Sequence, residues 1–206
     1  MLSRRLLLAA AAVAGLALAG CSKGGASGPA EGDMSMGDPN APVKMVEYAS
    51  MSCSHCAQFN NEVFPAFKTK YIDTGKVHYT LKEFLTPPEQ VATAGFLLAR
   101  CAGEDKYFSV VDAIFHNQAE MFQTGDATGV RTVLLRIAQS AGLTEEQFNA
   151  CLTDEEEIKA LDARVTRAVR EDKITGTPTF VINGKQIASG EVTLAQLEAA
   201  VAEAQK

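Results

Sequence analysis

The sequence predicts an α/β fold in which a small sheet is flanked by helices and carries an all-helical insertion. Short apolar or alternating segments, typical of strands, occur at residues 43–50, 77–81 and 179–188. Between the second and the third of these segments, from about residue 88 to 173, the apolar spacing is helical almost throughout. A Cys-x-x-Cys motif stands directly between the first strand and a helical pattern.

The first 42 residues are expected to lie outside the folded domain. Arg4 and Arg5 precede an apolar run that is shorter than the roughly 20 residues of a membrane span, so residues 1–20 are predicted to be a signal peptide. The two arginines also fit a loose twin-arginine export signal. Residues 21–42 are rich in Gly, Ser, Ala, Pro and Asp, which predicts a flexible tether.

The end of the signal peptide carries a candidate lipidation site. Leu18-Ala19-Gly20-Cys21 resembles the lipobox of bacterial lipoproteins. That resemblance implies cleavage before Cys21, a lipid on its thiol and a membrane-anchored protein of the periplasm or cell envelope. An ordinary secretory signal with an unrelated cysteine is the alternative.

The remaining residues, 43–206, are enough for one domain with a single core. The formal net charge of the full chain is −6 and no basic patch occurs, so nucleic acid is not expected as a partner. The sequence holds no internal repeat, Walker motif or dinucleotide-binding glycine turn, and no cofactor is predicted.

The elements of this domain follow in order. Residues 43–50 form a mostly apolar strand, and the Cys-Ser-His-Cys motif at 53–56 opens a helix with apolar residues at positions 59, 63, 64 and 67. Val77, Tyr79 and Leu81 alternate with polar residues in the second strand. The long helical block is then divided at Gly103, Gly125-Asp126, Gly142 and Thr153-Asp154.

The last elements are a hairpin and a helix. Residues 179–182 and 186–188 are predicted to pair, because Asn183-Gly184 between them suits a tight two-residue turn. Residues 193–196 then cap a final amphipathic helix that carries Leu194, Leu197 and Val201.

Five cysteines divide between three expected roles. With Cys21 assigned to lipid, Cys53, Cys56, Cys101 and Cys151 remain, an even number that suggests two pairs in an exported protein. Four cysteines allow three connectivities, and the sequence alone does not choose among them.

The spacing of Cys53 and Cys56 fits a redox motif or half of a zinc site. A zinc site needs further ligands, and His55, His78 and His116 form no second cluster with the distant cysteines. The redox interpretation is therefore favoured and no metal is predicted. His78 and His116 are interpreted as isolated surface or core histidines.

Cys101 and Cys151 have a different setting. Each falls on the apolar face of a predicted helix, Cys101 with Leu97 and Leu98 and Cys151 with Phe148. They could be two small buried hydrophobic residues. An oxidising compartment favours a structural disulfide between them.

From residue 43 to the C-terminal helix the chain resembles the thioredoxin superfamily, and within it the DsbA-like branch. The Cys-x-x-Cys motif follows the first strand, Gly-Thr-Pro-Thr-Phe at 176–180 looks like the cis-proline loop, and Glu47 lies six residues before Cys53. The helical block lies between the second strand and that loop, as in DsbA-like proteins. The resemblance implies a thioredoxin-like fold with an all-helical insertion between the βαβ half and the cis-Pro ββα half.

The resemblance implies thiol–disulfide exchange at Cys53 and Cys56. A cysteine at a helix N-terminus is stabilised as thiolate by the helix dipole and by free backbone N–H groups, so Cys53 is expected to attack and Cys56 to resolve. His55 is expected to add a donor or partial positive charge beside the Cys53 sulfur. Pro178 is expected to be cis and to pack on the disulfide, with the Thr177 backbone offered to an extended substrate.

Glu47 is a carboxylate in a strand that should be central to the sheet. A buried carboxylate needs a partner or has a raised pKa. It could form an ion pair with Lys82 in the next strand, or act as a proton relay or tuner for Cys56, and the two roles are compatible.

Two residues depart from the best-known DsbA pattern and leave the direction of catalysis open. Ser54 replaces a proline and Thr177 replaces a valine, and threonine there also occurs in isomerase and reductase branches. The preferred hypothesis is an oxidase of freshly exported, unfolded or reduced proteins that a quinone-linked membrane partner reoxidises. The helical insertion favours it, since it could add an apolar peptide groove.

Two alternative functions remain open. One is a periplasmic reductase or isomerase that a membrane electron donor keeps reduced. The other is a Cu(I) carrier that uses Cys53 and Cys56 together with Met34 and Met36 of the tether, since thiolates and thioethers suit Cu(I).

Overall fold

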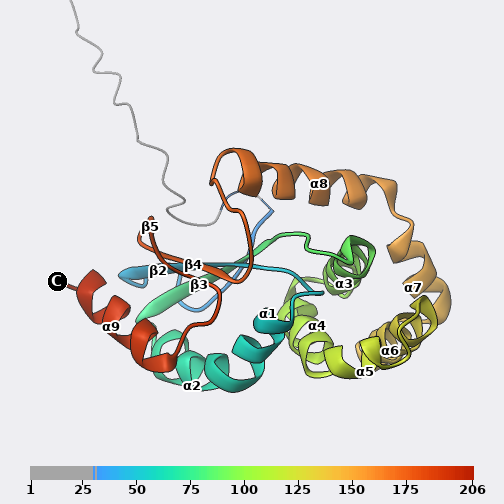
Figure 1. Ribbon diagram of the computed structural model, residues 1–206, viewed down its shortest axis with the longest axis horizontal. Helices are drawn as coiled ribbons and strands as arrows, with labels where there is room; N and C mark the ends of the chain where they lie inside the picture. Colours follow the sequence, from blue (N-terminus) through green and yellow to red (C-terminus); the bar gives the residue numbers. More distant parts are fainter. Residues whose placement is uncertain (1–29, 31) are drawn as a thin grey trace, which may run out of the picture.

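The computed structural model describes residue 30 and residues 32–206. The predicted signal peptide and Cys21 lie outside the described residues. Within these, a single five-stranded sheet has the order β1-β3-β2-β4-β5 (Figure 1). The strands are β1 (Met34–Met36), β2 (Val43–Ala49), β3 (Val77–Glu83), β4 (Thr179–Ile182) and β5 (Lys185–Ser189).

The two halves of the sheet differ in strand direction. β2 and β3 are parallel, whereas β1 with β3, β2 with β4 and β4 with β5 are antiparallel. The parallel pair needs a crossover, which the helical segment after the Cys-x-x-Cys motif provides. This segment consists of α1 (Ser54–Gln58), the π-helical η1 (Phe59–Val63), α2 (Phe64–Phe67) and the π-helical η2 (Lys68–Ile72).

The predicted tether does not extend to residue 42. Met34–Met36 pair with Tyr79–Leu81 as the edge strand β1, and the Ser35 hydroxyl lies 2.9 Å from that of Thr80. The composition of this stretch gave no sign of a strand, because three residues carry almost no periodicity. They are ordered by the open edge of β3, whose backbone groups need partners.

The helical insertion lies between β3 and β4, as predicted. Its helices are α3 (Glu89–Cys101), α4 (Glu104–His116), α5 (Gln118–Gln123), α6 (Ala127–Ser140), α7 (Glu145–Leu152) and α8 (Glu155–Arg170). Asp126 and Asp154 cap α6 and α8 by accepting backbone N–H groups of the first turn. The breaks predicted at turn-forming residues are therefore confirmed.

Helices cover both faces of the sheet (Figure 1). On one face a large core joins β2 and β3 to the crossover segment and to α3, α4, α6 and α7. On the other face α8 returns over the sheet, where Ala168 and Ile174 pack against Val46, Tyr48 and Val181. None of the helices in the described part of the chain is long and apolar enough to span a bilayer.

Long-range links fasten the insertion to the sheet. A disulfide joins Cys101 at the end of α3 to Cys151 in α7, with Cα atoms 5.9 Å apart. The buried carboxylate of Glu83, at the end of β3, accepts from Arg100 of α3 and Arg164 of α8. The disulfide thus joins two helices within the insertion, and the ion pairs of Glu83 fasten the insertion to the sheet.

The C-terminal elements agree with the sequence. Asn183 and Gly184 both have positive φ, 46° and 80°, as a two-residue hairpin turn between β4 and β5 requires. The last helix, α9 (Leu194–Ala204), begins with a capping box between Thr193 and Gln196.

Candidate active site

The Cys-x-x-Cys motif lies at the N-terminus of α1, just beyond the end of β2. Cys53 is the N-cap residue, with extended backbone angles, and its Sγ accepts the backbone N–H of Cys56 at 3.2 Å. Ser54 and His55 are exposed on the first turn. Cys56 is fully buried, whereas Cys53 keeps 9% of its surface exposed. Cys53 is therefore the thiol that a substrate can reach.

The loop before β4 faces the motif. Its Thr177–Pro178 peptide bond is cis, as the resemblance implied, and the Cys53 Sγ lies 3.5 Å from the Thr177 carbonyl oxygen. The Pro178 carbonyl accepts the N–H of Gly190 at 2.7 Å, which ties this loop to the end of β5. The fold thus brings Thr177 into contact with the sulfur of Cys53, although the two residues are 124 positions apart in the chain.

The two cysteines have opposite acidities. The pKa of Cys53 is lowered to about 6, first by a hydrogen bond with the Cys56 thiol and further by contact with Thr177 and the backbone N–H groups of Cys56 and His55; burial acts against this. The pKa of Cys56 is raised, chiefly by burial, then by its bond to Cys53 and by the charges of Cys53 and Glu47. One sulfur is a thiolate near neutral pH and the other stays protonated.

Alkylation of the reduced protein by iodoacetamide is expected to reach half of its maximal rate near pH 6, because only the thiolate reacts. The folded pKa lies below that of an unfolded cysteine, about 8.5. The stabilisation is therefore fully present above the unfolded pKa and is lost as the pH falls through 6. The Cys53→Ser variant should lose the reaction, and a midpoint near 8.5 in the native protein would contradict the assignment.

His55 supplies a donor to the Cys53 sulfur through its backbone N–H, which helps to lower the pKa of Cys53. Its ring lies elsewhere: Nδ1 is 3.1 Å from the Glu191 carboxylate, and both side chains are largely exposed. The sequence indicated a donor at this position but not the contact with Glu191, which is distant in the chain.

Glu47 is buried in β2 and accepts the hydroxyl of Tyr79 at 2.5 Å. Its pKa is raised to about 8, chiefly by burial and also by the charge of Cys53, while the Tyr79 bond lowers it. The predicted pair with Lys82 is wrong. Glu47 is in register with Leu81, so Lys82 points to the opposite face, where it contacts Asp33 and Asp172 at 3.6 and 3.4 Å.

Gln118 binds the backbone that leads into the motif, and this residue was not predicted from the sequence. It is buried at the start of α5, and its Nε2 donates to the carbonyls of Met51 and Cys53 at 3.0 and 3.1 Å. A single glutamine within a helical block gives no sequence signal, because its partners lie 67 and 65 residues away.

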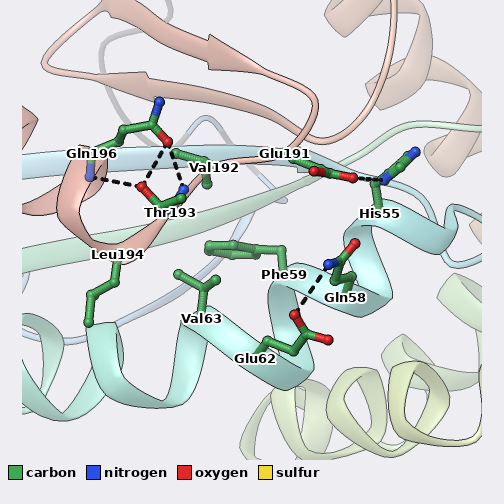
Figure 2. A pocket seen from close by; sticks show the side chains of 10 residues that line it. All are labelled: His55, Gln58, Phe59, Glu62, Val63, Glu191, Val192, Thr193, Leu194 and Gln196. Atoms are coloured by element: carbon green, nitrogen blue, oxygen red, sulfur yellow. Dashed lines mark hydrogen bonds and ion pairs between the residues drawn. The ribbon is translucent and has the colours of Figure 1, made fainter.

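A cavity of about 520 Å³ adjoins the motif (Figure 2). Phe59, Val63, Val192 and Leu194 form its apolar surface, and the His55–Glu191 pair lies at one end. It lies between the crossover segment and the loop that leads into α9. The helical insertion does not line this cavity, but it has an apolar cavity of its own, of about 270 Å³, whose lining includes Val91, Val130 and Phe148.

The remaining candidate ligands lie apart from one another. Met34 and Met36 belong to β1 and pack against the large core, so they are not part of a tether. His78 is buried in β3, and His116 is exposed, with its ring 3.3 Å from Asp112. Across residue 30 and residues 32–206, no three His, Cys, Asp or Glu side chains are gathered as a metal site would need.

Comparisons with known proteins agree with this geometry. A protein named for protein-disulfide oxidoreductase activity in Rickettsia bellii is 33% identical over 156 residues, which are 76% of this chain and 59% of that protein. The chain spans only 55–59% of the length of the rickettsial relatives that it matches. A Bacillus cereus protein named for disulfide bond formation is 27% identical, over 73% of this chain and 69% of that protein.

Solved structures agree in the same way. The crystal structure of alpha-DsbA1 from Wolbachia pipientis has a TM-score of 0.76 and 29% identity, and the match covers 85% of this chain and 92% of that one. BdbD from Bacillus subtilis has a TM-score of 0.73 at 20% identity, over 87% and 97% of the two chains, and supports the fold alone. The family model described as thioredoxin matches residues 29–203. The chain belongs to the thioredoxin family, and its fold is the thioredoxin-like fold with a helical insertion that DsbA structures have.

Proposed function

We propose that this protein is a thiol–disulfide oxidoreductase that works as an oxidase, donating a Cys53–Cys56 disulfide to exported proteins. The observation that carries the proposal is the opposite acidity of two thiols in one motif. The pKa of Cys53 is lowered to about 6, whereas burial raises that of Cys56. A sulfur of low pKa is a good leaving group in exchange, and a buried partner is protected from outside attack.

The reaction runs in two exchanges. A substrate thiolate attacks the Cys53 sulfur of the disulfide, the S–S bond breaks, and Cys56 leaves as a thiolate that takes up a proton. A second substrate thiolate then attacks the substrate sulfur of the mixed disulfide, and Cys53 leaves as a thiolate. The substrate loses two electrons and gains a disulfide, and the protein becomes a dithiol.

Glu47 has the acidity that the buried proton transfer needs. Its pKa is about 8, so at neutral pH it is mostly a carboxylic acid that can give a proton to the Cys56 thiolate. In the opposite direction its carboxylate can take the proton of the Cys56 thiol. The same group thus serves both directions of exchange.

The oxidase direction rests on the stability of the reduced form. Hydrogen bonds from the helix N-terminus favour the Cys53 thiolate, and whatever stabilises the reduced dithiol makes the disulfide more oxidising. Threonine at position 177 also occurs in reductase branches, and this residue is the reason to test reduction of substrate disulfides as the alternative.

The cavity beside the motif suggests polypeptide substrates. Its apolar surface of Phe59, Val63, Val192 and Leu194 would accept an apolar side chain next to the substrate cysteine. The Thr177 backbone, close to the Cys53 sulfur, would pair with an extended segment. An unfolded chain offers both features and a folded protein rarely does.

The proposed location is the periplasm or cell envelope, with a lipid anchor on Cys21 and reoxidation by a quinone-linked membrane protein. The lipobox-like sequence supports the anchor. The Cys101–Cys151 disulfide supports an oxidising compartment.

The proposal is tested by the reduction potential of the Cys53–Cys56 pair and by turnover. We expect a potential nearer to the roughly −120 mV of DsbA than to the roughly −270 mV of thioredoxin. Catalytic amounts of the oxidised protein should speed the oxidation of a reduced, unfolded polypeptide beyond the rate with glutathione disulfide alone. A potential near that of thioredoxin would instead assign a reductase, and tight Cu(I) binding without turnover would assign a metal carrier.

A further inference from the structure

Tyr79 makes the one side-chain hydrogen bond that the structure gives the buried acid Glu47. The two residues lie on adjacent parallel strands and on the same face, because Tyr79 is in register with Met45, two residues before Glu47. The hydroxyl of Tyr79 donates to Oε2 of Glu47 at 2.5 Å. Tyr79 is itself only 2% exposed, so water does not compete for this bond.

The ring of Tyr79 is fixed by aromatic neighbours. The centroid of Phe64 in α2 lies 4.9 Å from it, and that of Phe108 in α4 lies 6.0 Å away. A ring packed on two sides keeps its hydroxyl aimed at one point. The contact is therefore built into the core rather than made by a mobile side chain.

None of the other described groups that act on the Glu47 carboxyl carries a positive charge. Cys53 and Cys56 approach it from the start of α1, and both bring negative charge when ionised. Phe180, its register partner on β4, is apolar. Tyr107 of α4 acts on the Tyr79 side of the pair. Lys82 lies on the opposite face of the sheet, with Asp33 and Asp172.

We propose that Tyr79 is a positioning residue for thiol–disulfide exchange: its hydroxyl orients the Glu47 carboxyl and favours the carboxylate, which sets the pH at which Glu47 exchanges a proton with Cys56. The inference rests on the proposed function. In the resolving step, the Glu47 carboxylate takes the proton of the Cys56 thiol. The Cys56 sulfur then attacks Cys53 in the mixed disulfide, and the substrate leaves as a thiolate.

Removing the hydroxyl removes a hydrogen bond to the charged form, so the acid holds its proton more tightly. Tyr79→Phe is therefore expected to move the pH midpoint of the Cys56-dependent step upward by about one unit or more. At pH 7 that step should slow roughly tenfold, since each pKa unit is a factor of ten in the ionised fraction. The attack by Cys53 should keep its midpoint near pH 6.

The chain offers a matched control in Tyr107→Phe. Tyr107 is also fully buried, and its hydroxyl has no hydrogen-bond partner among the described residues. Tyr107→Phe also removes a tyrosine hydroxyl from the core, but it removes no hydrogen bond to Glu47. Neither midpoint should move in this variant.

The experiment uses one equivalent of 5,5′-dithiobis(2-nitrobenzoate) with the reduced full-length protein at pH 5–9. The first thionitrobenzoate released reports attack by Cys53, and the second reports resolution by Cys56. We expect Tyr79→Phe to shift only the second profile. The role of Tyr79 would be overturned if the second profile of Tyr79→Phe coincided with that of the native protein. It would also be overturned if Tyr107→Phe shifted that profile equally.

Two further measurements keep the outcome decisive. If Tyr79→Phe does not fold, 3-fluorotyrosine at position 79 keeps the shape of the ring, and its more acidic hydroxyl should move the second midpoint downward; an unchanged midpoint would refute the proposal. If the native protein releases no second thionitrobenzoate, exchange itself fails, which is distinct from a failure of Tyr79.

Discussion

Cys53→Ser is expected to lower the oxidation of a reduced polypeptide to the uncatalysed background, a loss of more than about 10³-fold. Cys53 is the more exposed cysteine of the pair, and its replacement leaves only a buried thiol that is protonated near neutral pH. Cys56→Ser is expected to have a different consequence. When this variant is given a polypeptide that contains a disulfide, its Cys53 thiolate still attacks that bond and one substrate sulfur leaves as a thiolate. No Cys56 thiol then resolves the mixed disulfide, which accumulates.

Mass spectrometry of non-reduced samples, together with turnover assays, distinguishes these two variants. Cys53→Ser should carry no substrate adduct, and Cys56→Ser should carry one adduct on Cys53. A variant that lacks Cys101 and Cys151 but keeps the motif serves as the control and should turn over when folded. Equal adduct formation by both single variants would contradict the assignment of Cys53 as attacking sulfur.

Cys101→Ala/Cys151→Ala is expected to lower the free energy of unfolding by about 4 kcal/mol. The bridge closes a loop with a sequence separation of 50, and the chain-entropy model gives this value for a loop of that length. For a domain of this size, the midpoint of thermal unfolding should fall by roughly 8–16 °C. Alanine suits the site because Cys151 is 6% exposed, so a serine hydroxyl there would need a partner.

Thermal unfolding followed by circular dichroism checks this expectation. Native protein in which this disulfide has been reduced should melt close to the double-alanine variant, because both lack the same covalent tie. The variant with Cys56→Ala alone is the matched control for the loss of a buried cysteine and keeps the bridge. A double-alanine variant that melts within about 2 °C of the oxidised native protein would show that the bridge does not limit the stability of the insertion.

Features that depend on near neighbours in the chain could be predicted from the amino-acid sequence. The Asn183-Gly184 turn, the capping box of Thr193 and Gln196, and the position of Cys53 at a helix start are each encoded within a few residues. Apart from β1, the order of strands and helices could be predicted for the same reason, because apolar periodicity is a local property. The even number of cysteines left after Cys21 indicated two pairs, and the structure contains the Cys101–Cys151 bridge.

Contacts between groups that are distant in the chain could not be predicted and became known from the three-dimensional structure. Glu47 was expected to pair with Lys82, but the parallel register of β2 and β3 turns Lys82 to the other face and brings Tyr79 to the carboxyl. The same dependence on packing gave His55 its partner Glu191 and placed a cavity of about 520 Å³ beside α1. Such contacts follow from register, side-chain direction and close packing across the core, and no local pattern of residues records them.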